Sequence, residues 1–169
     1  MRLHLSILAI AIICASVASA QDLPTRKAGL WDVTITYDAQ TKLPPLVTLH
    51  CTDEATDKLM NAFGDTGAAK CSREIQKIGA TIVVNAVCQV EPIKWASQTV
   101  ISGDFDSHYT VRMTSQVEGL PEWQALIMAF AIGPYTMQAR WVGACKADQR
   151  PGDIMLSDGS KLNIKEFPK

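Results

Sequence analysis

The sequence lacks the motifs that mark most enzymes and metal sites. It contains no G-x-S-x-G nucleophile motif, no phosphate-binding P-loop and no dinucleotide-binding fingerprint. Its five cysteines include no C-x-x-C pair and the chain has only three histidines, which argues against a zinc site. We therefore expect a protein that is not an enzyme, with no cofactor and no metal.

The sequence also lacks an excess of charge of one sign, and it lacks a long hydrophobic run after its first 20 residues. Lys and Arg total 16 and Asp and Glu total 17, which gives a formal net charge of −1. This balance does not favour nucleic acid as a partner. After residue 20, no apolar run reaches the roughly 20 residues that a membrane-spanning helix needs. We therefore expect no transmembrane segment in the mature chain.

The first 20 residues have the pattern of a secretory signal peptide. Arg2 gives a positive start, residues 5–17 are mostly apolar, and Ala18-Ser19-Ala20 is a small-residue cleavage site. We expect cleavage after Ala20 and a mature protein in the periplasm or outside the cell. The regions expected are a signal peptide (1–20), a polar lead-in (21–28), a single β-rich domain (29–153) and a C-terminal tail or hairpin (154–169).

Alternation of apolar and polar residues predicts β-strands along most of the mature chain. In "LWDVTITYD", Trp31, Val33, Ile35 and Tyr37 share one side, which is typical of a half-buried strand. Turn residues predict hairpins at "SGD" (102–104) and "SDGS" (157–160). Further strands are expected near 47–51, 71–78, 81–89, 94–102, 105–117 and 135–143.

Two segments predict helices instead. Near 53–63, Thr52 can cap a helix whose apolar stripe would be Ala55, Leu59, Ala62 and Phe63. Near 121–132, "LPEWQALIMAFAIG" is apolar on all sides between Pro121 and Gly133. We expect this second helix to be buried as a lid on the sheet, or exposed as a docking surface.

Strands joined by short turns predict a mainly β fold with minor α content. We expect an antiparallel meander that forms a curled sheet or a partly open barrel, with Val47, Leu49 and Cys51 on the apolar face of the second strand. The residues expected to share the core are Trp31, Tyr37, Leu49, Val84, Tyr109, Val111, Met137 and Trp141.

The four cysteines that follow the signal peptide predict disulfides. A two-residue turn at Gly79-Ala80 places Cys71 opposite Cys88 as a non-hydrogen-bonded pair, in which the Cα atoms lie close together. Cys51 and Cys145, expected on inner faces at strand ends, would then form the second bond. The alternative pairs Cys51 with Cys71 and Cys88 with Cys145, and we favour the first scheme.

Candidate chemistry is sparse. Asp106 and His108 lie on one expected strand face with Asp104 nearby, and we interpret them as a solvated face beside a turn. His50 and Cys51 are neighbours on a strand and so point to opposite faces.

The most favoured function is a binding module for an apolar small molecule or lipid. The alternative is an envelope interaction module that uses residues 120–133. The possible ligand or partner surface comprises Trp123, Ile127, Phe130 and Trp141.

Several stretches occur in an order that resembles a known family. These are "KAGLWDVT", a cysteine ending the next strand, the cysteine pair of 71–88, "SGDFDSHYTVRM" and "RWVGACKADQRPGD". Over about residues 27–153 the chain resembles the secreted bacterial domain-of-unknown-function (DUF) family 3617. The resemblance implies a periplasmic or envelope location in a Gram-negative bacterium and implies no activity. The apolar segment 119–133 departs from the polar loop usual in the family, and residues after Asp153 extend beyond the resemblance.

Overall fold

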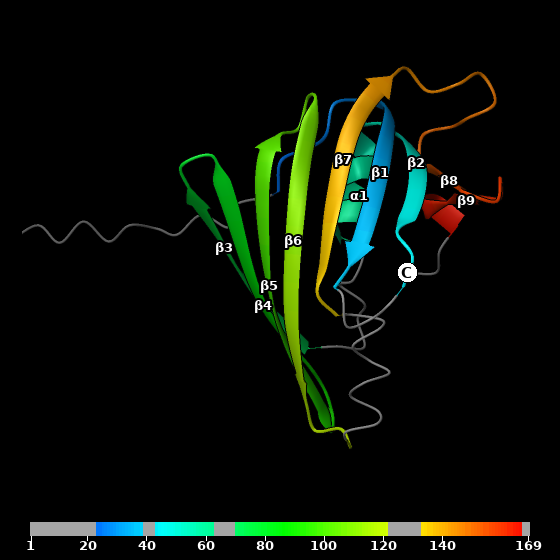
Figure 1. Cartoon of the computed structure of the whole chain (residues 1–169). Coiled ribbons are helices and arrows are strands. Elements are labelled where there is room, and N and C mark those ends of the chain that lie inside the picture. Colours follow the sequence, from blue (N-terminus) through cyan, green and yellow to red (C-terminus); the bar gives the residue numbers. More distant parts are fainter. Residues whose placement is uncertain (1–22, 39–42, 63–69, 122–132, 167–169) are drawn as a thin grey trace, which may run out of the picture.

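Over the residues that the structure describes, the protein is a curved antiparallel sheet with an α-helix packed against one side (Figure 1). The structure, a computed structural model, describes residues 23–38, 43–62, 70–121 and 133–166. Within these ranges the fold is mainly β and the sheet does not close on itself, since β3 and β9 are its two edges. The predicted fold class is confirmed, in its open, curled form.

The strands are long in the middle of the sheet and short at its C-terminal end. Their bounds are β1 Gly29–Tyr37, β2 Leu46–Thr52, β3 Lys70–Ile78, β4 Thr81–Val90, β5 Ile93–Asp104, β6 His108–Glu118, β7 Tyr135–Gly143, β8 Asp153–Leu156 and β9 Lys161–Asn163. The helices are α1 Glu54–Ala62 and the 3₁₀ turn η1 Ile164–Glu166. The expected helix near 121–132 falls outside the described residues.

The order of strands across the sheet is β3-β4-β5-β6-β7-β1-β2-β8-β9. Five consecutive strands, β3 to β7, form the predicted meander. The N-terminal hairpin β1–β2 pairs with β7 on one side and with β8 on the other. The hairpin expected at "SDGS" therefore forms as β8–β9 and extends the same sheet.

One face of the sheet, which we call the inner face, bears Trp31, Val33, Tyr109 and Val111. Trp31 and Val33 are completely buried there. Paired residues of neighbouring strands share a face, so the registers carry the same face from β1 through β7 to β3. The buried core consists of Trp31, Val33, Ile82, Val84, Ile101, Tyr109, Val111 and Ala139, with Met137 and Trp141 packed against it.

The sequence analysis assigned the wrong residues of β2 to the inner face, because the alternation is shifted by one residue. Trp31 pairs with His50 and Val33 pairs with Thr48, so Thr48 and His50 lie on the inner face. Val47, Leu49 and Cys51 lie on the opposite, outer face, and Val47 is 44% exposed. Leu49 is therefore not part of the shared core, and Tyr37, at the far end of β1, is only half-buried.

The helix prediction was right in place and wrong in detail. Asp53, not Thr52, is the cap, because its Oδ1 accepts a hydrogen bond from the backbone N–H of Thr56 at 2.8 Å. The Thr56 hydroxyl accepts one in return from the Asp53 backbone N–H at 3.0 Å. The buried side of α1 carries Thr56 and Asp57, whereas Leu59 of the expected apolar stripe is 40% exposed. Polar contacts, not an apolar stripe, decide which face of α1 packs inward.

The turn between β5 and β6 lies three residues later than "SGD" predicts. Asp104 pairs with His108, so the loop is residues 105–107 and Gly103 lies inside β5. The Asp104 carboxylate accepts hydrogen bonds from the backbone N–H groups of Asp106 and Ser107, at 3.0 and 2.5 Å. Such a side-chain-to-backbone turn explains the shift, because it fixes the loop after Asp104.

Candidate functional site

A cavity of about 430 Å³ lies on the inner face, between strands β3 to β7 and the helix α1. Its volume falls within the range of roughly 300–1,000 Å³ that is usual for small-molecule sites. Most of its lining is apolar, as ligand pockets generally are. The apolar lining residues include Leu23, Pro24, Met60, Val84, Trp95, Ile101, Phe105, Val111, Met113 and Met137.

The disulfide between Cys71 and Cys88 forms part of the cavity wall. The β3–β4 register pairs Ile78 with Thr81 and Cys71 with Cys88, as a two-residue turn at Gly79-Ala80 requires. Gly79 has a φ of 62°, a left-handed conformation that favours glycine. The Cα atoms of the two cysteines are 4.0 Å apart. The turn therefore places a covalent link on the inner side of the outermost hairpin.

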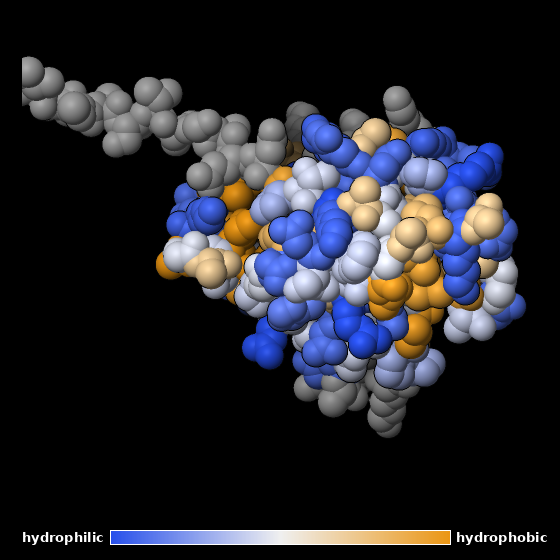
Figure 2. Space-filling model, turned by 90° about the horizontal axis from the view of Figure 1, so that it is seen from above, coloured by the Kyte–Doolittle hydropathy of each residue, from blue (hydrophilic) through white to orange (hydrophobic). Residues whose placement is uncertain are grey.

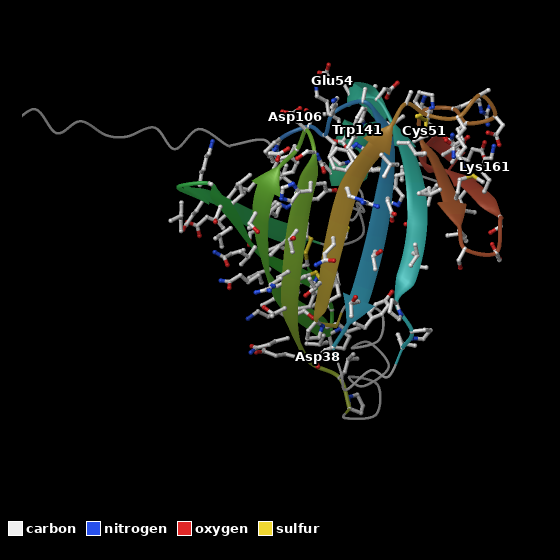
Figure 3. The ribbon with its side chains drawn as sticks, turned by 45° about the horizontal axis from the view of Figure 1, so that its top comes forward. Asp38, Cys51, Glu54, Asp106, Trp141 and Lys161 are labelled. Atoms are coloured by element: carbon white, nitrogen blue, oxygen red, sulfur yellow. A yellow bond between two sulfur atoms is a disulfide. The ribbon has the colours of Figure 1, made fainter. Side chains whose placement is uncertain are left out.

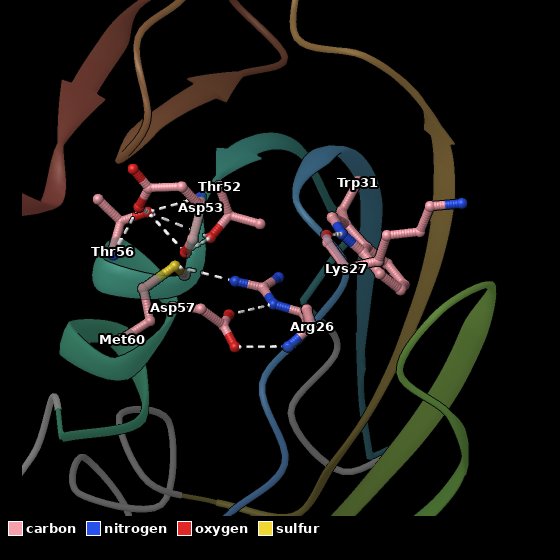
Figure 4. A network of polar contacts seen from close by, with 8 residues as sticks. All are labelled: Arg26, Lys27, Trp31, Thr52, Asp53, Thr56, Asp57 and Met60. Atoms are coloured by element: carbon pink, nitrogen blue, oxygen red, sulfur yellow. Dashed lines mark hydrogen bonds and ion pairs between the residues drawn. The ribbon is translucent and has the colours of Figure 1, made fainter.

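A buried ion pair closes the end of the cavity next to α1 (Figure 4). The Asp57 carboxylate accepts two hydrogen bonds from Arg26, one from the backbone N–H at 2.8 Å and one from Nε at 2.5 Å. Arg26 is 7% exposed and Asp57 is 1% exposed. A buried charge is tolerated only when it is paired in this way. The pair therefore fixes the lead-in segment to the helix.

Arg26 also contacts aromatic and sulfur groups of the cavity end. Its Nη2 donates to Met60 Sδ at 3.1 Å, and its guanidinium lies 5.9 Å from the centre of the Trp31 ring. Tyr109 lies beside it, with its ring 5.5 Å from Trp31 and stacked on Phe105 at 5.0 Å. Burial raises the pKa of the Tyr109 hydroxyl, so this group stays protonated and can donate a hydrogen bond.

His50 is a further titratable residue in the lining, and its imidazole is largely shielded from solvent. Burial, with a further contribution from the Arg26 charge, lowers the pKa of its imidazole to about 3. Its Nε2 lies 3.0 Å from the Thr48 hydroxyl. Among the described residues, its Nδ1 has no hydrogen-bond partner although it is buried. The ring is therefore neutral at ordinary pH and keeps one nitrogen unsatisfied beside the cavity.

The second disulfide, Cys51–Cys145, lies away from the cavity at the end of the sheet that carries Trp141 (Figure 3). Cys51 pairs with Leu30 and so shares the outer face, which corrects the expected inner position. The structure thus has the favoured disulfide scheme, but the second bond fastens the outer side of β2 to the segment after β7.

Trp141 lies on β7 at that same end and is half-buried. Its indole Nε1 donates to the Ala28 carbonyl at 3.1 Å, and the Lys27 ammonium lies 3.7 Å from its ring centre. A Cβ at Gly29 would clash with the backbone carbonyl oxygen of Gly143 and lie 2.6 Å from Trp141 Nε1, and the φ of this residue is 131°, so glycine is required there. Trp141 packs against the core and is not one of the residues that line the cavity.

The structure does not describe the other residues that were expected to form a ligand or partner surface. Trp123, Ile127 and Phe130 lie outside the described residues. Seen from above, hydrophobic side chains appear in separate places with hydrophilic ones between them (Figure 2). The exposed valines of the outer face include Val47 and Val142, each 44% exposed.

The sequence analysis did not place Arg26, Asp57 or Met60 at a site, and it considered His50 only as the neighbour of Cys51 on a strand. Arg26 stands in a segment that reads as a polar lead-in, and nothing local marks it as buried. The alternation Thr48–His50 could have identified the inner face of β2, had polar residues been allowed there. The exposed Asp104 carboxylate lies 3.6 Å from His108 Nδ1, and Asp106 belongs to the turn.

Within the described residues, no group of three or more His, Cys, Asp or Glu is arranged to hold a metal ion. No helix in the same part of the chain is long and apolar enough to cross a membrane.

Comparison with known proteins gives a family and no function. The family described as "Protein of unknown function (DUF3617)" matches residues 26–145, which is most of the chain. This range contains the ion pair, all four bonded cysteines and the cavity lining except Leu23 and Pro24. Neither the curated proteins nor the solved structures gave a match. The chain belongs to the DUF3617 family.

Proposed function

We propose that this protein is an exported, non-catalytic binding module for an apolar small molecule or lipid, which it holds on the inner face of its sheet. The observation that supports the proposal is the cavity of about 430 Å³ with its largely apolar lining. An apolar ligand would gain roughly 25 cal/mol for each Å² of apolar surface removed from water.

The polar residues of the cavity favour binding over catalysis. The Arg26 guanidinium is paired with Asp57 and does not offer a free charge to a reacting group. With a pKa of about 3, His50 is a very weak base near neutral pH, whereas a general base works best with a pKa close to the operating pH. These groups suit the orientation of a ligand.

Two features support export to the periplasm or beyond. The first 20 residues have the pattern of a signal peptide. The protein contains two disulfides, which persist in oxidising compartments. The test is to express the full chain in a Gram-negative host and to sequence the N-terminus of the periplasmic product. We expect it to begin at Gln21, and a product that retains Met1 in the cytoplasm would contradict export.

Uptake of the neutral fluorescent probe N-phenyl-naphthylamine by the purified protein tests the binding function. Ser97 lines the cavity, and the next residue, Gln98, is exposed on the opposite face of β5. Ser97→Phe should fill the cavity and reduce uptake, while Gln98→Phe is the matched control and should leave uptake unchanged. Equal uptake by both variants and the unmodified protein would show that the probe does not enter the cavity.

The same experiment distinguishes the alternative proposal, an envelope interaction module that docks through residues 120–133. Size-exclusion chromatography, run with the probe present, reports whether the protein that binds the probe is a monomer. Uptake by a monomer supports the cavity. Uptake only by self-associated protein would favour an exposed apolar surface.

A further inference from the structure

We infer that the ligand carries a neutral hydroxyl head group, which donates a hydrogen bond to Nδ1 of His50 while its apolar chain fills the cavity. The inference rests on the proposed binding function and adds the chemistry of the ligand's polar end. A long-chain alcohol is the simplest molecule of this class.

The unsatisfied nitrogen of His50 is the first step of the argument. A buried polar atom without a partner costs about 1–3 kcal/mol, so such atoms are rare in native proteins. Here the ring lines the cavity, and Nδ1 has no partner in the described part of the chain. Nδ1 is almost inaccessible to solvent, so a ligand reaches it only when neighbouring side chains move slightly. A hydrogen-bonding group brought to this point would then satisfy the atom.

The hydrogen bonds around Thr48 indicate which kind of group is needed. The Thr48 hydroxyl is within reach of the Val33 carbonyl, at 3.5 Å, to which it can only donate. It then accepts from Nε2–H of His50, at 3.0 Å, and the neutral ring leaves Nδ1 with a lone pair. The nearby Arg26 charge also favours a lone pair over an N–H group. Nδ1 is therefore an acceptor, and the ligand must supply the donor.

The charges beside His50 do not favour an ionised head group, although Arg73 of β3 also lies in the cavity lining. Asp57 neutralises Arg26, so a carboxylate would find no free cation there and would meet the lone pair of Nδ1. An ammonium group could donate to Nδ1, but it would lie near the Arg26 charge. A hydroxyl group avoids both costs, and it can also accept a hydrogen bond from donors such as the Tyr109 hydroxyl, which lines the same cavity.

The test compares three ligands with the same chain length: dodecanol, dodecanoate and dodecane, each used to displace N-phenyl-naphthylamine. We expect dodecanol to displace the probe at the lowest concentration. His50→Phe should weaken dodecanol relative to dodecane by about threefold to tenfold, the value of one lost hydrogen bond. The ratio is the readout because His50 lines the cavity, so the substitution also alters the surface that meets the probe and dodecane. His50→Gln, which retains an acceptor oxygen, should keep part of the preference for dodecanol.

His108→Phe is the matched control, since His108 is an exposed histidine on β6 and should not affect any of the three ligands. Near-ultraviolet circular dichroism checks that each variant is folded. If His50→Phe does not fold, the test uses the unmodified protein, and NMR records the ¹⁵N signals of its histidine rings with and without dodecanol. Dodecanol should shift the His50 Nδ1 signal and leave the His108 signals unchanged.

Several results would overturn the inference. Stronger displacement by dodecanoate or by dodecane, or unchanged His50 signals with dodecanol bound, would refute a hydroxyl head group at His50 and leave apolar binding intact. Absence of probe uptake by the unmodified protein would instead refute the binding function, and the inference with it. The two failures are therefore distinguishable.

Discussion

The Nε atom of Arg26 lies 2.5 Å from Oδ1 of Asp57, and both side chains are nearly inaccessible to solvent. Neither residue belongs to a strand: Arg26 precedes β1, and Asp57 lies in α1. The contact therefore holds two segments outside the sheet together at the cavity end. The backbone N–H of Arg26 adds a second bond to the same carboxylate, which fixes the path of the chain as well as the side chain.

Removal of one partner of this pair should be costly. Asp57→Ala leaves the Arg26 charge buried and unpaired, and we expect a loss of about 3–5 kcal/mol in the free energy of unfolding. Urea denaturation measures the loss. Glu54→Ala, in the same helix, removes an exposed ion pair with Lys58 and is the control. A midpoint for Asp57→Ala as close to the unmodified protein as that of Glu54→Ala would contradict the prediction.

Stability should fall between pH 6.5 and pH 4 because of His50. Its folded pKa of about 3 lies below the unfolded value of 6.5, so the unfolded state binds the proton more tightly. The contribution is complete above pH 6.5 and is lost as the pH falls toward 3. The loss at pH 4 should be on the order of 3 kcal/mol. Urea denaturation across this range measures it.

The matched variant for this prediction is His50→Phe, whose stability should depend much less on pH over the same window. Carboxyl groups whose pKa is lowered in the folded protein add a loss of their own near the lower end of this window, and that part should remain in His50→Phe. The backbone N–H of Thr56, for example, lowers the pKa of Asp53, whose contribution is present above its usual range and lost at lower pH. An equal pH dependence in His50→Phe would assign the loss to other groups.

The two disulfides should differ in their effect on stability. Cys71 and Cys88 are separated by 17 residues, and Cys51 and Cys145 by 94. From loop entropy, we expect a loss of about 3 kcal/mol for the double alanine variant of the first pair and about 4–5 kcal/mol for the second. Thermal and urea denaturation of the two variants give the comparison. A larger loss for the shorter loop would show that the Cys71–Cys88 sulfur atoms matter chiefly as part of the cavity wall.

The two tryptophans paired across β1 and β7 should also differ. Trp31 is completely buried, and Trp31→Ala should cost about 3–5 kcal/mol. Trp141 is half-buried, and Trp141→Ala should cost about 1–2 kcal/mol through lost packing, its bond to the Ala28 carbonyl and its contact with Lys27. Urea denaturation measures both, and equal losses would mean that Trp141 is buried as deeply as Trp31.

The sequence predicts the features that depend on neighbours along the chain. The β3–β4 register follows from Gly79 in a two-residue turn, and the same register places Cys71 opposite Cys88. The inner face of β1 follows from alternation that begins at Trp31, since β1 is apolar on one side. In such segments local geometry and apolar pattern agree, so no knowledge of distant contacts is needed.

The features that the sequence does not predict depend on distant polar partners. In β2 the inner residues are Thr48 and His50, and the more apolar residues of the strand lie on the outer face. In α1 the inward residue Asp57 is selected by Arg26, 31 residues earlier in the chain. An apolar pattern cannot identify an inner face that is polar. This is why the polar end of the cavity was not predicted, although Val84, Val111 and Met137 of its apolar wall were predicted to share the core.

The position of β1 in the middle of the sheet has a consequence for the order of folding. Its neighbour β7 is synthesised last among the long strands, and the Ala28 carbonyl meets Trp141 across 113 residues of chain. Such non-local pairing is typical of domains that fold slowly, in milliseconds to seconds. A chain that ends before Tyr135 should contain two separate groups, β1–β2 and β3–β6, that are open to protease, because the strand that joins them into one core does not yet exist.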